Sequence, residues 1–259
     1  MSLLRKWSHL VRFVISGSDG LKGYPVGAGK WIVYGKGRRH AIRLRANTAD
    51  FNVFKHIFVD PAYSFRRLHF NNDLARRYER ILARGRNPLI IDCGANNGCS
   101  ALWFKFQYPK ARVVAVEPEE SNFLVLSINV EGANVEVFNR AVHSCNVSLS
   151  VVASGDETAF RTIDAVAGAR SIESITIPEL VSDEDDLFIV KIDIEGFEHD
   201  LFAANTGWVD DTDLIVMELH DHLFAGQAHS RPFFEALMRS APRDFTHRGE
   251  NIFSLKTTQ

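Results

Sequence analysis

Short runs of apolar residues recur after residue 87, and helical patterns of apolar and polar positions separate them. Runs such as Leu89–Ile91 and Val113–Val116 are continuous rather than alternating, which is typical of strands buried on both faces of a parallel sheet. Strands that alternate with helices predict an α/β fold with an open, doubly wound sheet. The expected elements are strands at 88–92, 112–117, 135–138, 187–193 and 214–219, helices at 98–107, 119–131 and 233–238, and paired antiparallel strands at 244–248 and 251–256.

The region before residue 87 has a different pattern, with helical spacing first and paired short strands later. We divide the chain into an N-terminal extension, residues 1–86, and a sheet domain, residues 87–259. The elements expected in the extension are an amphipathic helix at 3–15, a glycine-rich connector at 17–29, a hairpin of strands 31–34 and 40–45, and helices at 50–58 and 73–84.

The segment between the third and fourth core strands is less regular. Residues 147–152 have the pattern of a strand, and Pro178 begins a short helix. Residues 154–170 show no clear period, so we expect a surface loop there.

The formal net charge of −2 conceals an uneven distribution of charge. Residues 1–86 contain 18 Lys and Arg against 5 Asp and Glu, a balance of +13, whereas residues 87–259 contain 12 against 27, a balance of −15. Two explanations fit. The basic extension docks against the acidic domain, or it faces an anionic partner such as a phosphorylated glycan carrier or a membrane surface. Residues 3–15 would make the peripheral membrane contact.

The cysteines and the hydropathy of the chain indicate the cellular compartment in which the protein is expected to function. No apolar stretch approaches the length of a membrane span, and the three cysteines show no paired spacing. A disulfide framework is therefore not expected, and a reducing, cytoplasmic setting fits best.

The strongest motif follows the first core strand. It has the order D-x-G-x-x-x-G, from Asp92 through Gly94 to Gly98, and a helix begins behind it. A tight turn between a strand and a helix N-terminus is where an open α/β sheet binds a nucleotide-like ligand, and glycines let the backbone approach it closely. No third glycine fits the dinucleotide spacing. We therefore expect S-adenosylmethionine, with Asp92 near its amino-acid portion.

Acids also end the other core strands. Glu117 is placed to accept both hydroxyls of a ribose, and Asp193 and Glu218 follow two later strands. Because ligands lie at the carboxyl ends of the strands, these three acids and Asp92 are expected to face one electronegative crevice, which suits a sulfonium cation. Asn139 fits a contact to the adenine edge and a turn asparagine equally well. The residues expected to bind the cofactor are Asp92, Gly94, Ala95, Asn96, Gly98, Glu117, Pro118 and Asn139.

Three segments resemble the FkbM family of S-adenosylmethionine-dependent methyltransferases: Ile91–Gly98, Glu117–Pro118 and Lys191–Glu198. The D-I-E-G-x-E pattern in the last is the most specific. The resemblance covers about residues 45–220, and the antiparallel ending is similar to the seven-stranded sheet of class I methyltransferases. It implies methyl transfer from S-adenosylmethionine to an oxygen, typically a hydroxyl of a sugar, a glycan or a polyketide-like metabolite.

Such a transfer requires that the acceptor proton be removed or shared. His220 is the first candidate base because an imidazole titrates near working pH, and Asp193 and Glu195 are alternatives or orient the acceptor. A surface or helix-capping histidine is an equally good interpretation of His220, and Glu198 fits an acid at a helix N-terminus. A divalent metal ion on Asp193, Glu218 and His220 follows only by analogy with catechol-type enzymes, and we do not favour it.

Two other classes of protein fit parts of the sequence. A nucleic-acid methyltransferase is not expected, because the Asn/Asp-Pro-Pro-Tyr/Phe signature and a Pro-Cys nucleophile are absent and basic residues do not alternate with stacking aromatics. The alternative function is a non-catalytic scaffold of the same fold that docks an anionic partner through its basic extension.

Overall fold

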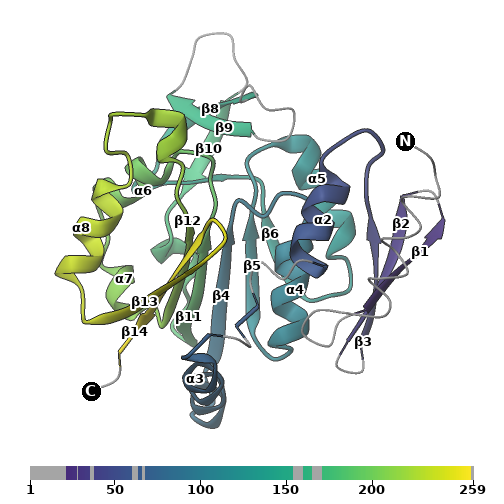
Figure 1. Ribbon diagram of the computed structural model, residues 1–259, viewed down its shortest axis with the longest axis horizontal. Coiled ribbons are helices and arrows are strands. Elements are labelled where there is room, and N and C mark those ends of the chain that lie inside the picture. Colours follow the sequence, from purple (N-terminus) through teal and green to yellow (C-terminus); the bar gives the residue numbers. More distant parts are fainter. Residues whose placement is uncertain are drawn as a thin grey trace.

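The computed structural model describes residues 22–27, 29–35, 38–59, 64–65, 68–153, 160–164 and 171–257, and its centre is a seven-stranded sheet (Figure 1). The strand order is β13-β14-β12-β11-β4-β5-β6, in which β14 is antiparallel to both of its neighbours and all other neighbouring strands pair in parallel. The expected α/β doubly wound sheet of the class I methyltransferase type is confirmed. The strands are β4 (Asn87–Cys93), β5 (Arg112–Val116), β6 (Val135–Phe138), β11 (Asp185–Ile192), β12 (Leu214–Glu218), β13 (Arg243–Arg248) and β14 (Asn251–Lys256).

The chain reverses its direction of travel across the sheet between β4 and β11. It runs from β4 outward to β5 and β6, then returns to β11 on the opposite side of β4. Loops that leave two such neighbouring strands go to opposite sides, and the crevice between them is where ligands bind in this class of sheet. The ends of β4 and β11 therefore position the candidate site.

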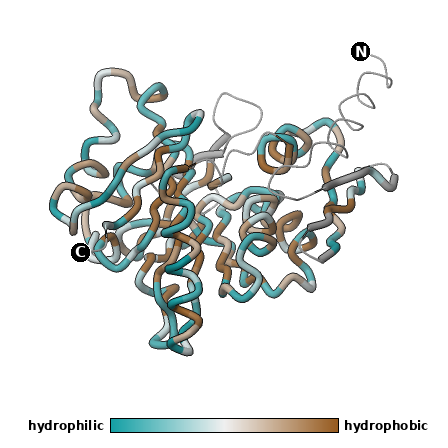
Figure 2. The backbone as a smooth tube through the Cα atoms, turned by 60° about the horizontal axis from the view of Figure 1, so that its bottom comes forward, coloured by the Kyte–Doolittle hydropathy of each residue, from teal (hydrophilic) through white to brown (hydrophobic). Residues whose placement is uncertain are grey.

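Helices cover both faces of the sheet because successive strand residues point to opposite faces. Ile90 packs in a core with helices α2 (Asp50–Phe58), α3 (Asn71–Ala83), α4 (Cys99–Gln107) and α5 (Glu120–Asn129). Leu89 and Ile91 pack in a second core with α6 (Glu198–Ala203), α7 (Trp208–Asp211) and α8 (Arg231–Arg239). Figure 2 shows hydrophobic residues gathered along the central strands. Burial on both faces explains why these strands are continuous apolar runs.

The N-terminal extension contains a three-stranded antiparallel sheet rather than a hairpin. Its strands are β1 (Lys22–Gly27), β2 (Lys30–Gly35) and β3 (Arg38–Arg43). The expected hairpin corresponds to β2 and β3, but the interpretation of 17–29 as a connector is wrong for 22–27, which pairs with β2. The predicted amphipathic helix at 3–15 lies outside the described residues.

Basic residues of the extension pair with acids of the sheet domain. The Arg77 guanidinium lies 2.5 Å from the Asp213 carboxylate, and Arg84 and Arg86 lie 2.7 and 2.5 Å from Asp186. Helices α2 and α3 also share a hydrophobic core with α4. These contacts favour the docking explanation of the charge asymmetry for α2, α3 and the two arginines that follow α3. The boundary at residue 87 stays a prediction.

A smaller four-stranded sheet follows β6, in the order β7-β10-β8-β9. Strand β8 confirms the strand expected at 147–152, but the expected surface loop at 154–170 is wrong for 160–164, which pairs with β8. Strands β8 and β9 are consecutive and pair antiparallel, but the sequence between them shows no clear period that predicts the second strand. The strands are β7 (Ala141–Val142), β8 (Ser148–Ala153), β9 (Phe160–Asp164) and β10 (Ser171–Ile175).

The remaining expected helices and strands occur within a few residues of their predicted bounds, and Pro178–Leu180 forms a 3-10 turn, η2. The short helix α7 and the 3-10 turn η3 (Asp221–Phe224) were not expected, whereas α6 begins at Glu198, the acid that fitted a helix N-terminus. Among the described residues, no helix combines the length and apolar character needed to cross a bilayer.

Candidate functional site

The glycine loop after β4 is pressed against the end of β11. Gly94 has a φ of +75°, and a Cβ there would lie 1.8 Å from the backbone oxygen of Asp193. Gly98 has a φ of +84°, and its Cβ would lie 2.8 Å from Cδ1 of Leu126. Both glycines are therefore required by contacts within the protein, whereas we expected them to make room for a ligand.

Glu117 lies buried at the end of β5 and anchors the glycine loop. Its two carboxylate oxygens accept backbone N–H groups, Oε2 from Asn96 at 2.8 Å and Oε1 from Glu119 at 3.0 Å. Burial raises the pKa of Glu117 to about 7, although these hydrogen bonds oppose the shift. The carboxylate keeps lone pairs beyond the two that these bonds use.

Asp92 lies behind the loop rather than in the crevice. It is fully buried, accepts a hydrogen bond from the Ser100 hydroxyl at 2.5 Å, and lies 3.1 Å from Nζ of Lys191. Burial raises the pKa of Asp92, and the positive charge of Lys191 opposes the rise. The expectation that all four strand-end acids face one crevice is therefore wrong for Asp92, because its partners are protein groups.

Lys191 is the residue that the sequence interpretation missed. It interrupts the apolar run of β11, and its Nζ donates to the backbone oxygen of Gly94 at 2.7 Å and lies 3.5 Å from Asp193. A lysine in a strand that is otherwise buried must be paired, and this was the available signal. It joins the ends of β4 and β11.

His220 forms the centre of a cluster of acids. Its side chain is 2% exposed, and Nδ1 lies 2.9 Å from Oε1 of Glu198, which is equally buried. The other ring nitrogen, Nε2, faces three carboxylates: Glu195 and Glu218 at 3.7 Å and Asp193 at 3.9 Å. Glu198 was expected to be a helix N-terminal acid. It does begin α6, but its carboxylate holds the imidazole.

The turn after β11 brings these acids together. Glu195 has a φ of +56° and Gly196 a φ of +95°, so the chain folds back sharply at the D-I-E-G pattern. The Glu198 carboxylate accepts the N–H of Gly196 at 3.2 Å, which closes the turn. A Cβ at Gly196 would lie 2.4 Å from the Phe224 ring.

Burial and mutual repulsion disfavour the ionised forms of two carboxylates in the cluster. Burial, and then the charge of Asp193, raise the pKa of Glu195 to about 7 and that of Glu218 to about 8. Burial alone would lower the pKa of His220, but the hydrogen bond and charge of Glu198, together with the other acids, raise it to about 9. Strongly shifted groups of this kind gather at functional sites.

Two adjoining hollows expose the site. A narrow one of about 50 Å³ includes Glu117, Pro118 and Asn122, and a wider one of about 390 Å³ includes Glu218 and Lys191. They share the lining residues Gly94, Asn96, Asp193 and Glu195. The wider hollow also contains Ala95 and several residues of α2. A larger hollow of about 530 Å³ beside α3 shares none of these residues.

The structure separates the expected cofactor residues into three groups. Gly94, Ala95, Asn96, Glu117 and Pro118 line the hollows. Asp92 and Gly98 pack behind them, and the Asn139 side chain donates to the backbone oxygens of Glu117 and Pro118 at 2.9 and 3.1 Å. These contacts fit the interpretation of Asn139 as a turn asparagine that stabilises the backbone at Glu117 and Pro118.

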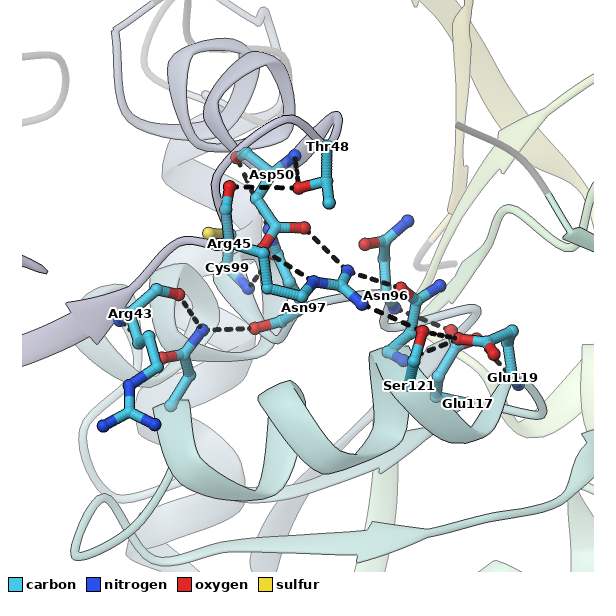
Figure 3. A network of polar contacts seen from close by, with 12 residues as sticks. Arg43, Arg45, Thr48, Asp50, Asn96, Asn97, Cys99, Glu117, Glu119 and Ser121 are labelled. Carbon is cyan, nitrogen blue, oxygen red and sulfur yellow. Dashed lines mark hydrogen bonds and ion pairs between the residues drawn. The ribbon is translucent and has the colours of Figure 1, made fainter. Parts of the chain in front are cut away.

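A polar network fastens the extension to the glycine loop (Figure 3). Arg45 donates to Asp50 at 2.7 Å and to Asn122 on α5 at 2.6 Å. The amide of Asn129 donates to the backbone oxygens of Arg43 at 2.9 Å and Asn97 at 2.8 Å. The extension therefore supports the loop directly, and none of these residues was singled out from the sequence.

Comparison with known proteins gives the following similarities. The model of the methyltransferase FkbM domain matches residues 92–245. The methyltransferase sdnD of Sordaria araneosa is 33% identical over 78 residues, which is 30% of this chain and 24% of that relative. The chain thus spans about a quarter of the length of that curated relative.

Among solved structures, monomeric WbdD is 14% identical with a TM-score of 0.41, covering 74% of this chain and 42% of that one. The precorrin-6y C5,15-methyltransferase of Geobacter metallireducens is 11% identical with a TM-score of 0.36, covering 76% and 93%.

Proposed function

Because the chain belongs to the FkbM methyltransferase family, we propose that it transfers the methyl group of S-adenosylmethionine to a hydroxyl oxygen. The acceptor we propose is a sugar, a glycan or a polyketide-like small molecule. The three cysteines are free thiols, which fits the cytoplasmic setting that we expect for this reaction.

The residues at the two hollows fit this cofactor in chemistry. Glu117 offers carboxylate lone pairs for the ribose hydroxyls beside the backbone of Asn96. Pro118 and Ala141 line the same narrow hollow and supply apolar surface toward the adenine. Asp193 and Glu195 line both hollows, and their negative charge favours a sulfonium. When bound, the cofactor supplies an electrophilic methyl group on a positively charged sulfur, which departs as a neutral thioether.

The cluster around His220 would act on the acceptor. In its neutral form, which a pKa of about 9 makes the minor form at neutral pH, His220 takes the hydroxyl proton at Nε2 while the new C–O bond forms and the S–C bond breaks. Glu198 holds the Nδ1–H and stabilises the imidazolium that results. Asp193 and Glu195 orient the acceptor because their carboxylates accept hydrogen bonds from its other hydroxyl groups. Alignment of methyl, oxygen and base supplies much of the rate enhancement.

The observation that carries this proposal is the fixed direction of His220. A buried carboxylate sets Nδ1, and Nε2 therefore points toward Asp193 and Glu195, which line both hollows. A histidine with only a packing or capping role would have no need of this arrangement.

The test has two stages. Calorimetry should show binding of S-adenosylmethionine and of its demethylated product. Incubation with isotope-labelled cofactor and a library of hydroxylated sugars and polyketides should then give a product whose label mass spectrometry locates on oxygen. Absence of cofactor binding, or a label on nitrogen or carbon, would overturn the proposal. Cofactor binding with no transfer to any hydroxylated acceptor would favour the non-catalytic scaffold.

A further inference from the structure

The distances from Nε2 of His220 to the surrounding carboxylate oxygens match the separations between ligand atoms that bind one metal ion. Separations of 3.7–3.9 Å to Asp193, Glu195 and Glu218 are too long for hydrogen bonds. Two ligand atoms that each lie about 2.1 Å from one metal ion are roughly 3 to 4 Å apart, depending on the angle between them. One ligand atom each from Asp193, Glu195 and His220 lies within 4.8 Å of the others.

The cluster also contains His220, whose buried imidazole is a second kind of metal ligand beside the carboxylates. Its side chain is 2% exposed, and the hydrogen bond to Glu198 fixes both the tautomer and the ring orientation. A histidine that binds a metal usually donates its other N–H to a carboxylate in this way. Nε2 is thereby directed between Asp193 and Glu195, and a bound cation would displace the proton from this nitrogen.

Lys191 is a positively charged side chain at the edge of the cluster. Lys191 lies 3.1 Å from Asp92 and 3.5 Å from Asp193, and it also donates to the Gly94 backbone oxygen. Its positive charge also acts on Glu195 and Glu218, where it opposes the rise of their pKa values. Both line the wider hollow of about 390 Å³, so that an ion and an acceptor can reach them from solvent.

We propose that Asp193, Glu195 and His220 bind one divalent cation, with Glu218 beside it, and that this cation coordinates the acceptor hydroxyl. Two carboxylates and one imidazole suit Mn²⁺ better than Mg²⁺, which prefers oxygen alone, or Zn²⁺, which prefers nitrogen and sulfur. The sequence suggested Glu218 as a ligand, whereas the geometry assigns that position to Glu195.

This inference rests on the proposed function and changes the role of one residue in it. With the cation bound, Nε2 of His220 is a ligand and does not take the proton. The O–H bond breaks because coordination lowers the pKa of the hydroxyl. The proton would pass to the Glu218 carboxylate, and the oxygen would form its bond to the methyl carbon as the S–C bond breaks and the neutral thioether leaves.

The test is Mn²⁺ binding to the full chain after chelation, followed by electron paramagnetic resonance and calorimetry. We expect one Mn²⁺ per chain, with affinity at least tenfold weaker in Asp193→Asn and in Glu195→Gln. Glu198→Gln should weaken binding about tenfold without removing a ligand. Glu250→Gln is the matched control, since Glu250 lines the same hollow outside the cluster, and its affinity should change less than threefold.

Cofactor binding is measured on the same chelated protein, together with circular dichroism of each variant. No stoichiometric Mn²⁺ binding, or unchanged affinity in a folded Glu195→Gln variant, would overturn the cation site. If S-adenosylmethionine still binds in that case, only this inference fails and His220 keeps its role as base. If Mn²⁺ binds and S-adenosylmethionine does not, the proposed function fails while the cation site stands.

Discussion

Glu198 accepts a hydrogen bond from Nδ1 of His220 at 2.9 Å, and both side chains are 2% exposed. The two residues come from different segments, the start of α6 and the residue before η3, two positions after the end of β12. Their contact ties the turn that contains the D-I-E-G pattern to the neighbouring strand end. The orientation of the imidazole therefore depends on a residue that does not line either hollow.

We expect Glu198→Gln to lower turnover while leaving affinity for S-adenosylmethionine nearly unchanged. The amide can still contact Nδ1 but no longer provides the charge that stabilises His220 in the required orientation. We expect kcat to fall by about 10²-fold or more, and steady-state kinetics with calorimetry would measure it. Asp200→Asn on the same helix is the control. A Glu198→Gln enzyme with normal kcat would show that this contact is only structural.

The raised pKa values of the cluster predict how stability changes with pH. Burial raises the pKa of Glu218 from 4.5 to about 8, so the folded state binds this proton more tightly than the unfolded state does. Its contribution is complete below pH 4.5 and is lost as the pH rises through 8. Glu218→Gln does not titrate. We therefore expect chelated Glu218→Gln to gain stability relative to the chelated parent protein between pH 5 and 9.

Urea unfolding at a series of pH values would measure this difference. His220 titrates with the same sign, because its pKa is raised from 6.5 to about 9 and its contribution is lost above that value. His220 lies 3.7 Å from Glu218, so the difference between the two proteins includes the change that the loss of the Glu218 charge makes to the titration of His220. A difference in unfolding free energy that is flat with pH would contradict the assigned shift.

Glu117→Ala is expected to weaken binding of S-adenosylmethionine. It removes a charge-assisted hydrogen-bond acceptor, which is worth on the order of 1.5–3 kcal/mol, or about 10- to 150-fold in Kd. The same change frees the N–H of Asn96, so a thermal melt without cofactor must be measured alongside. Glu119→Ala, next to the same loop, serves as the control. Unchanged affinity in Glu117→Ala would refute the assignment to the ribose.

The parallel strands could be predicted because each is buried on both faces and is therefore a continuous apolar run. Strand β10 could not, because its sequence Ser-Ile-Glu-Ser-Ile is short and pairs with β7 and β8 through contacts distant in the chain. Contacts distant in the chain also explain why Asp92 was wrongly expected to face the crevice. Its partner Lys191 is far along the sequence, and nothing local shows that this acid is already paired.

The candidate site was predicted in its residue types better than in its geometry. Asp193, Glu195 and His220 do gather at strand ends, as the doubly wound order requires. The role of Glu198 depends on how far the chain folds back after β11, which is set by the left-handed conformation of Glu195 and Gly196. Backbone conformation of this kind at a non-glycine residue has no reliable signal in one sequence.

Gly94 gives the sharpest prediction about the loop. A Cβ on this residue would lie 1.8 Å from the backbone oxygen of Asp193, so Gly94→Ala must push apart the ends of β4 and β11. The left-handed conformation alone costs an alanine roughly 1–2 kcal/mol, and overpacking against backbone adds about 1–3 kcal/mol. We expect Gly94→Ala to lose about two- to threefold more free energy of unfolding than a control that suffers the conformational effect alone.

Gly132 supplies that control. Its φ of +73° is nearly the same as that of Gly94, but nothing lies within 4 Å of the position that its Cβ would take. Gly132→Ala should therefore lose only about 1–2 kcal/mol, and chemical denaturation of the two variants measures the difference. Equal losses would mean that the close approach of the loop to Asp193 is not maintained in solution. Since Asp193 and Glu195 belong to the turn that follows, Gly94→Ala should also disturb the cluster around His220, whereas Gly132→Ala should not.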